Sequence, residues 1–361
     1  MKNISLQLTD FKCHKDTSIA LNNLTLLTGA NAAGKSSVIQ SILLAKLALS
    51  NKKEGMNVVD ISLKEQLYNL DLGNVDDLIN KNTLDDEVEI FINGKKFYFG
   101  GDEAPEINTL RMHIPEDYED IAHILENFQY LSAEREGPRY EYDLDNKRKK
   151  GCGCNGQYTA SVIYNNDFTQ IQSAKVFTKE GSAGFKAQLN EWIQYIFPNI
   201  SLTVVANGLT KIQASVNNGS ARTVSAAPNI GFGISYGLPI LVELLLATEE
   251  SFVIIENPEA HLHAKAQSNM GYFIGKMAAS GVRVLVESHS EHIVNGIRRA
   301  IVSKECALNS DDVTIYFFSF LSEVLSQKKI TVDSMGNLSA FPIDFFDQQR
   351  QDSMEIFKLQ G

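Results

Sequence analysis

A nine-residue segment constrains the fold of this chain more than any other feature. Residues 29–37 read Gly-Ala-Asn-Ala-Ala-Gly-Lys-Ser-Ser, which fits the phosphate-loop spacing G-x-x-x-x-G-K-[ST]. The glycines of such a loop allow a tight turn, so that successive backbone N–H groups point at phosphate oxygens. The lysine reaches the outer phosphates of a nucleotide, and the first serine hydroxyl binds Mg²⁺. We predict nucleotide contacts from the whole loop: Gly29, Ala30, Asn31, Ala32, Ala33, Gly34, Lys35, Ser36 and Ser37.

The residues around the loop have the pattern that this interpretation requires. Residues 24–28 form an apolar run typical of a buried strand, and apolar residues then recur at helical spacing from Val38 to Leu47. A strand, a loop and a helix in this order place a positive helix N-terminus under the phosphates. The alternative, a chance glycine-rich turn, does not require such flanks.

Composition and charge limit the remaining functions. The chain has 361 residues, 43% of them hydrophobic, which is enough for one large α/β domain or two lobes. Its net charge of -11 argues against attraction of the whole surface to nucleic acid. The four cysteines form no disulfide-like framework, the N-terminus lacks a signal-peptide core, and no uncharged apolar stretch approaches a membrane span. We therefore expect a cytoplasmic protein with no membrane segment.

Hydrophobic periodicity predicts alternating strands and helices. Two half-buried strands are expected at 4–8 and 19–21, and Asn-Gly pairs predict hairpins at 87–99 and 201–216. Residues 51–86 have an irregular pattern, and residues 102–129 a helical or loop-like one. The other expected elements are helices at 37–50 and 184–197, a strand at 221–225, a helix from Leu238, strands at 252–255, 282–286 and 313–318, intervening helices reaching about residues 279 and 303, and a closing hairpin at 330–332 and 338–341.

Two of the buried strands end in polar clusters. Residues 252–255 lead into Glu256-Asn-Pro-Glu259-Ala-His-Leu-His263, and residues 282–286 lead into Glu287-Ser-His289-Ser-Glu-His292. A carboxylate at the C-terminal tip of such a strand is where a phosphate-loop fold holds Mg²⁺ and the attacking water. The pattern therefore predicts Glu256 as a metal ligand together with Ser36.

Other polar groups allow more than one interpretation. Cys152 and Cys154 are candidates for zinc, but their spacing is not C-x-x-C, which favours a flexible loop. The basic run 147–150 is either a nucleic-acid contact or, more commonly for such runs, a solvated loop. Arg135 and Arg139 either face phosphates or pair with Glu134 and Glu136. A metal cluster is a further alternative for His261, His263, His289 and His292.

The order of these motifs resembles one family. A phosphate loop, the glycine-rich segment 229–237, an acidic strand with Pro-Glu-Ala-His-Leu-His and a strand ending in Ser-His-Ser look like the ABC-type ATPase heads of the RecF, SMC and OLD-like group. The opening residues 4–11 resemble the usual start of that group. The element Glu256-Asn-Pro-Glu-Ala-His-Leu-His263 and the C-terminal Phe345-Phe-Asp347 are similar to its compact single-chain ATPases.

The resemblance implies a fold and a domain organisation. The fold is an α/β P-loop NTPase of ABC type, with a mixed or parallel central sheet, helices on both sides and an antiparallel, strand-rich N-terminal lobe. The implied organisation is a single domain over residues 1–361. Its parts are a lobe at 1–100 with the Walker A loop, a variable insert at 101–225, and a lobe at 226–361 with the signature, Walker B and switch-histidine motifs.

The resemblance also assigns roles by position. Residues 29–37 take the Walker A place, Glu256 the Walker B place, and His289 that of the switch histidine, which holds the γ-phosphate. Ser235 and Gly237 stand where the ABC signature contacts the ATP of a partner subunit. The signature is degenerate here, and Gln66 is the only candidate for the Q-loop glutamine.

One departure from the family pattern concerns hydrolysis. Asn257 occupies the position where many relatives carry the catalytic glutamate. An amide can orient a water but cannot take its proton near neutral pH. Glu259 lies close enough to act in its place through a water. The sequence therefore predicts slow turnover.

The functional expectation follows from the resemblance. It implies Mg²⁺ and ATP as cofactors, a homodimer or higher oligomer formed through ATP, and a separate effector such as a nuclease or toxin, often in bacterial defence against phage. An alternative is a DNA-binding repair ATPase of the RecF kind. A small-molecule P-loop kinase is a third, although a kinase needs neither a signature segment nor a switch histidine.

Overall fold

The structure is a computed structural model that describes most of the chain. The described ranges are 3–83, 86–100, 105–139, 141–144, 151–178, 181–208, 210–219, 223–226, 232–322, 324–346 and 348–360. Within these ranges, no helix combines the length and the apolar character that crossing a bilayer requires.

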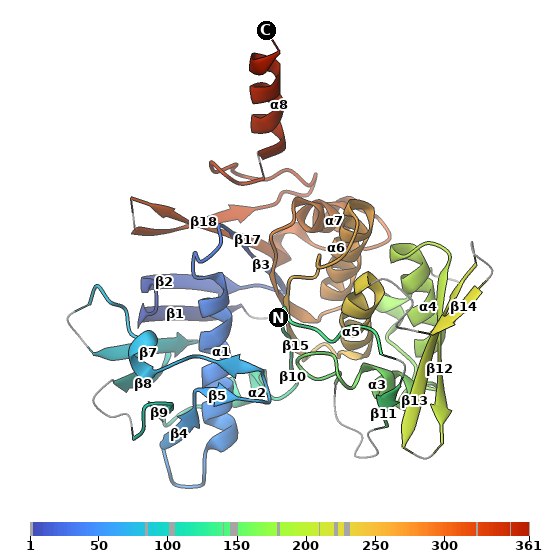
Figure 1. Ribbon diagram of the computed structural model, residues 1–361. Coiled ribbons are helices and arrows are strands. Elements are labelled where there is room, and N and C mark those ends of the chain that lie inside the picture. Colours follow the sequence, from blue (N-terminus) through green and yellow to red (C-terminus); the bar gives the residue numbers. More distant parts are fainter. Residues whose placement is uncertain are drawn as a thin grey trace.

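An antiparallel sheet of six strands forms the N-terminal lobe, at the lower left of Figure 1. Its order is β2-β1-β7-β8-β9-β4. Along β1, Leu6 and Leu8 are buried and alternate with more exposed residues, so the sheet has one core face. The strands are β1 Ile4–Phe11, β2 His14–Leu21, β4 Val58–Ser62, β7 Glu87–Ile92, β8 Lys95–Gly100 and β9 Thr109–His113.

A second sheet of six strands crosses the centre of the molecule in the order β10-β15-β16-β3-β17-β18. Its first five strands run parallel, and β18 pairs antiparallel with β17. This mixed sheet confirms the predicted α/β fold class. The strands are β3 Leu24–Gly29, β10 Phe128–Leu131, β15 Phe252–Glu256, β16 Arg283–Glu287, β17 Val313–Leu321 and β18 Val324–Thr331.

Successive residues of the central strands face two different cores, as the pleat of a strand requires. Val284 and Val286 pack with three helices, α5 to α7, on one face. Leu285 between them packs with α1 and the N-terminal sheet on the other face. The central strands are therefore apolar on both sides, which explains their continuous hydrophobic runs. These helices are α1 Lys35–Asn51, α5 Phe232–Leu246, α6 Ala264–Ala279 and α7 Glu291–Val302.

A smaller antiparallel sheet and the helices α3 and α4 lie at the right of Figure 1, and they form only the later part of the predicted insert, because β9 and β10 belong to the two larger sheets. The hairpin of β12 Ile200–Asn207 and β13 Lys211–Asn218 and the helix α4 Phe185–Ile196 confirm two predictions. Trp192 of α4 is fully buried in the core that the insert shares with α5 and α6. The insert also contains β11 Tyr142–Asp143, α3 Thr159–Asn165 and β14 Thr223–Ala226.

Among the predicted strands and irregular segments, three predictions were wrong. Residues 51–86, predicted to be irregular, contain β4 and the short pair β5 Lys64–Glu65 and β6 Leu70–Asp71. Residues 102–129, predicted to be helix or loop, contain the strand β9, the short helix α2 Glu119–Ile124 and the start of β10.

The third error concerns the C-terminal hairpin, which pairs β17 with β18. The predicted pairing of 330–332 with 338–341 is reduced to one bridge, between Val332 and Leu338. β18 is an edge strand with mostly polar, half-exposed residues, so it lacks the apolar alternation by which a strand is recognised. The final helix α8 Gln348–Leu359 projects away from the body at the top of Figure 1.

Candidate nucleotide-binding site

The phosphate loop connects β3 to α1, as predicted. β3 ends at Gly29 and α1 begins at Lys35. The ammonium group of Lys35 folds back over the loop and donates to the carbonyl oxygens of Gly29, at 3.1 Å, and of Ala30, at 2.7 Å. Burial lowers the pKa of Lys35, and the nearby charge of Glu287 opposes this effect. The lysine is thus held at the centre of the loop.

Both fixed glycines of the loop are required by contacts with distant segments. Gly29 has φ 128°, and a Cβ there would lie 1.9 Å from the carbonyl oxygen of Phe318. Gly34 has φ 83°, and a Cβ there would lie 2.5 Å from the sulfur of Cys13. His14 supports the loop from below, because its Nε2 lies 2.9 Å from the oxygen of Gly34. Sequence reasoning missed Cys13 and His14, since only the folded β1–β2 hairpin brings them under the loop.

The tips of β15 and β16 place two glutamates side by side. Glu256 and Glu287 are opposite each other in the parallel register. Ser36 donates its hydroxyl to Glu287, with Oγ 3.1 Å and 3.0 Å from the two carboxylate oxygens. Sequence reasoning paired Ser36 with Glu256 and gave Glu287 no role. The signal was present, because Glu287 follows the apolar run 282–286 just as Glu256 follows 252–255.

Glu256 is bound by other donors. The Tyr130 hydroxyl donates to its Oε1 and the backbone N–H of Ala133 donates to its Oε2, both at 3.1 Å. Burial raises the pKa of Glu256, and these two hydrogen bonds oppose the shift. Burial raises the pKa of Glu287 to about 7, and the charge of Glu256 adds to that shift. A buried acid and a partly buried acid at one sheet edge form a site at which positive charge is favourable.

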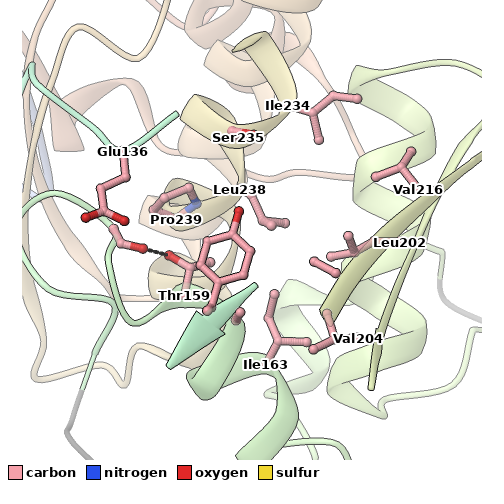
Figure 2. Close-up of a pocket in the computed structure, with 14 residues that line it drawn as sticks. Glu136, Thr159, Ile163, Leu202, Val204, Val216, Ile234, Ser235, Leu238 and Pro239 are labelled. Carbon is pink, nitrogen blue, oxygen red and sulfur yellow. Dashed lines mark hydrogen bonds between the residues drawn. The ribbon is translucent and has the colours of Figure 1, made fainter. Parts of the chain in front are cut away.

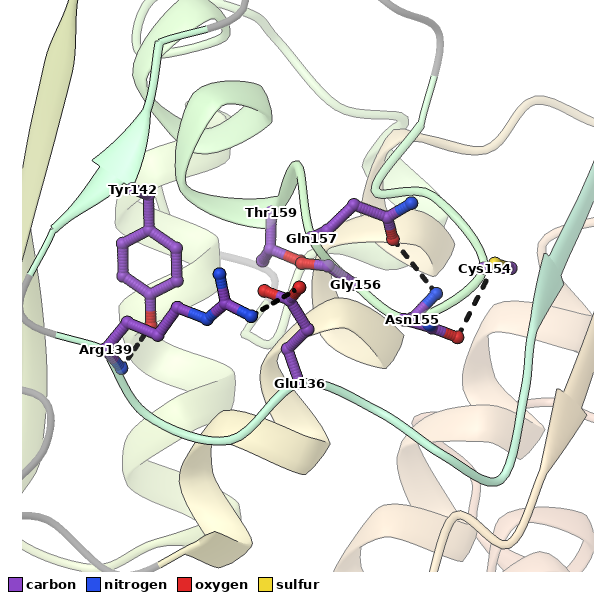
Figure 3. Close-up of polar contacts among 8 residues, drawn as sticks. All are labelled: Glu136, Arg139, Tyr142, Cys154, Asn155, Gly156, Gln157 and Thr159. Carbon is purple, nitrogen blue, oxygen red and sulfur yellow. Dashed lines mark hydrogen bonds and ion pairs between the residues drawn. The ribbon is translucent and has the colours of Figure 1, made fainter. Parts of the chain in front are cut away.

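Arg135 fixes the backbone after β15. Its buried guanidinium donates to the carbonyl oxygens of Ser132 at 2.7 Å, Glu256 at 2.6 Å and Asn257 at 2.6 Å. Burial lowers its pKa to about 10. Arg135 thus binds backbone oxygens, and neither of the two alternatives drawn from the sequence, phosphates or a neighbouring glutamate, describes these contacts. The pairing with a glutamate holds for Arg139, which lies 2.8 Å from Glu136 (Figure 3).

The loop after β15 is tied to the loop after β16. Asn257 has a left-handed backbone, φ 45°, which asparagine tolerates, and its N–H donates to the Glu287 carbonyl oxygen at 2.8 Å. Glu259 accepts from the Ser288 hydroxyl at 2.8 Å and from the His289 N–H at 2.7 Å. The structure thus brings three predicted catalytic residues together, and it shows Glu259 holding the segment that carries His289.

The imidazole of His289 is exposed at this edge of the sheet. Desolvation and the charge of Lys35 lower its pKa, and the charge of Glu259 opposes them. The neutral imidazole is therefore favoured near neutral pH.

The signature segment lies inside a helix. The helix α5 begins at Phe232, six residues before the predicted start, so Ser235 and Gly237 lie in its first two turns and not in a loop. Residues 229–231 lie outside the described ranges. Gly237 is buried, and a Cβ there would lie 3.2 Å from the Phe197 ring and 3.3 Å from the Met270 methyl group. Gly237 therefore serves helix packing and leaves Ser235 as the candidate contact.

Ser235 borders a pocket between α5, α3 and the β12–β13 hairpin (Figure 2). Leu202 and Val204 approach it from β12, and Ile234 and Leu238 approach it from α5. The polar residues that line this pocket include Glu136, Tyr142, Thr159 and Ser235. Arg139 donates its backbone N–H to the Tyr142 hydroxyl at 3.2 Å (Figure 3).

The start of α5 also contacts the loop after β15. The ring of Tyr236 lies 4.7 Å from that of His261 and 5.5 Å from the guanidinium carbon of Arg135. Phe232, which is about half exposed, stacks on His261 with centroids 5.4 Å apart. His261 is thus occupied by aromatic contacts with the signature helix.

The remaining candidates have other surroundings. Cys152 and Cys154 are buried free thiols, and among the described residues no group of three or more His, Cys, Asp or Glu side chains is placed to hold a metal ion by itself. Gln66 lies between β5 and β6, on the wall of a separate cavity with Tyr68 and Tyr130. The basic run 147–150 and Asp347 lie outside the described residues.

Family models cover most of the chain. A model described as an AAA domain matches residues 5–194. A second AAA-domain model, whose description names the AbiEii toxin and type IV toxin–antitoxin systems, matches residues 102–295. A model described as a protein of unknown function (DUF3696) matches residues 308–356. No curated protein is significantly similar in sequence to this chain.

Solved structures of SMC heads share the fold. The Smc head domain with an extended coiled coil from Pyrococcus furiosus, bound to the C-terminal domain of ScpA, is 12% identical, with a TM-score of 0.54 and coverage of 99% of this chain and 98% of that chain. An SmcHead bound to the C-winged helix domain of ScpA is 12% identical, with a TM-score of 0.50 and coverage of 92% and 98%. The chain therefore belongs to the AAA-domain family, and its fold is that of the SMC heads.

Proposed function

We propose that this protein is a Mg²⁺-dependent ATP-binding switch that hydrolyses ATP slowly, dimerises through ATP and controls a separate effector. The observation that carries this proposal is the convergence of Lys35, Ser36, Glu256, Glu287 and His289 at the edge of one parallel sheet. Acidic oxygen donors, a lysine and a histidine beside a phosphate loop suit a nucleotide triphosphate with its metal ion.

The residues present fit Mg²⁺. This ion takes oxygen ligands and is usually held through one or two carboxylates together with substrate phosphates. The ligands that the Ser36 hydroxyl and the two neighbouring carboxylates offer to a metal ion are oxygen atoms. When bound, Mg²⁺ would neutralise charge that develops on the β- and γ-phosphates.

The side chains around the phosphates have separate tasks in this proposal. Lys35 exchanges its two carbonyl partners for phosphate oxygens. Neutral His289 donates to the γ-phosphate from an exposed position at the dimer-facing edge. Glu259 keeps His289 in place through its backbone N–H.

Slow turnover follows from the group next to Glu256. Asn257 orients a water but does not take its proton. Phosphoryl transfer depends mainly on positioning and electrostatics, so hydrolysis continues without a strong base. We expect turnover well under the roughly 10 s⁻¹ that is typical of enzymes. A long-lived ATP-bound state suits a switch better than a motor.

Two comparisons support a partner. The second family model names a toxin and type IV toxin–antitoxin systems, and the solved SMC heads are bound to ScpA. We extend these relations to this chain as a proposal: the ATP-bound dimer controls a nuclease or toxin in bacterial defence against phage. We also propose that residues 1–361 act as a single ATPase domain in the cytoplasm.

Calorimetry on Lys35→Ala tests the nucleotide site. Removal of the ammonium group leaves the loop backbone but deletes a cation that faces several phosphate charges. We expect at least about a tenfold loss of ATP affinity, or about 1.4 kcal/mol. Lys53→Ala, which removes the same charge from an exposed position, should bind ATP as the unmodified chain does. Equal ATP affinity in Lys35→Ala, with unchanged thermal unfolding, would refute the assignment.

A further inference from the structure

The place of β16 in the sheet singles out Glu287. β16 lies between β3, which carries the phosphate loop, and β15, which carries Glu256. The tip of β16 is therefore the strand end next to the first turn of α1. Glu287 is only 6% exposed, and both of its carboxylate oxygens lie within 3.1 Å of the Ser36 hydroxyl oxygen.

Glu256 is less available to Ser36. Each of its two oxygens already accepts a hydrogen bond, one from Tyr130 and one from Ala133. These donors come from β10 and the segment after it, on the side of β15 that is away from the phosphate loop. The two glutamates therefore have different partners although they are neighbours in register.

The hydrogen bond of Ser36 has a consequence for metal binding. A serine hydroxyl that binds a cation through an oxygen lone pair must direct its proton elsewhere, and a carboxylate is a strong acceptor for that proton. Glu287 is that acceptor in the structure, so the lone pairs of Ser36 are left for a cation. Outer partners of this kind orient metal ligands and tune their affinity.

We propose that Glu287 positions Ser36 for the divalent cation of the bound nucleotide and makes nucleotide binding strongly dependent on that cation. The proposal rests on the proposed ATP-binding function. Glu287 acts in two ways: it accepts the Ser36 proton, and its charge attracts the cation.

The charges that face Glu287 give the proposal a second part. Glu256 from β15 and Glu259 from the following loop are negative, and Lys35 from α1 is positive. Without a cation, Glu287 and Glu256 repel the phosphates and partly cancel Lys35. With a cation, the same carboxylates stabilise it. Glu287 therefore weakens metal-free nucleotide binding and strengthens metal-dependent binding.

The two effects have opposite signs, which a merely structural role would not produce. We define the coupling as the ratio of nucleotide affinities with and without the cation. Substitution Glu287→Gln keeps the shape and an oxygen acceptor but removes the charge. It should lower the coupling at least about tenfold while metal-free affinity stays equal or rises.

The experiment measures this coupling with Mn²⁺ as the probe and a non-hydrolysable ATP analogue as the nucleotide. Nucleotide affinity is measured by calorimetry in EDTA and in Mn²⁺, and bound Mn²⁺ is counted by electron paramagnetic resonance. Glu250→Gln is the matched control, because it removes the same charge from an exposed residue before the opposite end of β15. Its coupling should equal that of the unmodified chain.

A double-mutant cycle tests whether Glu287 acts through Ser36. In a Ser36→Ala background, Glu287→Gln should change the coupling much less than in the unmodified chain, since the positioned hydroxyl is gone. An unchanged coupling in Glu287→Gln, with the nucleotide still bound, would overturn the inference alone. Failure of the unmodified chain to bind the nucleotide in either medium would overturn the proposed function itself.

Discussion

At the scale of single residues, the phosphate loop depends on two segments that are far apart in the sequence. Ala30 donates its N–H to the Phe318 oxygen at 3.1 Å, and His14 contacts the oxygen of Gly34 while its Nδ1 lies 2.9 Å from the Thr17 hydroxyl. Both ring nitrogens of this buried histidine are therefore engaged. The loop is held from below by β2 and from the side by β17, which makes its shape sensitive to small additions of volume.

Gly34→Ala tests this dependence. The new methyl group would meet Cys13 and His14 at 2.5 Å and 2.7 Å, in a backbone conformation that already disfavours alanine. Gly94→Ala is the matched control, because Gly94 has φ 76° but nothing lies within 4 Å of a Cβ. We expect the control to cost about 1 kcal/mol of unfolding free energy. Gly34→Ala should cost clearly more and weaken ATP binding, as measured by urea unfolding and calorimetry. Equal costs would show that the contacts under the loop are soft.

Single-turnover hydrolysis distinguishes the roles of Glu256, Glu259 and His289 at the strand tips. Glu256→Gln should abolish cleavage, and His289→Ala should reduce it strongly. Glu259→Gln keeps only one of the two oxygens that accept from Ser288 and His289, so one of these hydrogen bonds is lost and we expect a partial loss of cleavage. An inactive Glu259→Gln together with an active Glu256→Gln would reverse the roles assigned to these carboxylates.

The local part of the site was predictable, and the non-local part was not. Gly29 to Ser37 follow from spacing alone, because the loop and its flanks are contiguous. The contact between Ser36 and Glu287 depends on which strand lies beside β3, and the periodicity of a local segment does not determine the order of strands in a sheet. Two equivalent glutamates therefore could not be distinguished from the sequence.

At the scale of elements, α5 connects the candidate signature to the core. Its first turns carry Ser235 and Tyr236, and its later turns are fully apolar except for Glu243. The predicted start at Leu238 was late because glycines and Ser235 weaken the helical pattern of the sequence. In the structure, Gly237 lets the helix pack closely against Phe197 and Met270. Pro239 lies inside the helix and has no N–H to donate to the carbonyl oxygen of Ser235, yet the helix continues beyond it to Leu246.

Glu243 gives α5 a measurable pH dependence. It is buried and accepts a hydrogen bond from the Cys152 N–H, and burial raises its pKa to about 7 from 4.5. The folded state thus binds this proton more tightly than the unfolded state does. The resulting stabilisation is present below about pH 4.5 and is lost as the pH rises through 7.

The free energy of unfolding of Glu243→Gln, measured in urea between pH 5 and 8, checks this expectation, because this range includes the raised pKa of Glu243. The variant should become more stable relative to the unmodified chain as the pH rises, by about 1.4 kcal/mol for each unit of pKa difference. Glu250→Gln, at an exposed position, should show no such trend. If the stability difference between Glu243→Gln and the unmodified chain did not change with pH, the pKa of Glu243 would not be raised in the folded state.

At the scale of the whole molecule, the central sheet separates two cores, and the candidate site lies at the carboxyl edge of its parallel strands. This is the usual position for ligands in open α/β sheets. The phosphate loop leads into α1, which packs in the core that contains the N-terminal sheet, whereas α5 packs in the other core. In the proposed dimer, the loop of one subunit and Ser235 of its partner therefore complete each ATP site.

Complementation between two inactive variants tests this composite site most directly. Lys35→Ala removes phosphate binding but leaves Ser235, whereas Ser235→Arg blocks closure but leaves the phosphate loop. Each variant alone should be inactive in ATP hydrolysis. Mixed in equal amounts they should regain about a quarter of the unmodified rate, since half of the dimers contain one intact site out of two. A mixture that stays inactive although mixed dimers form, or a Ser235→Arg variant with full activity alone, would contradict the account.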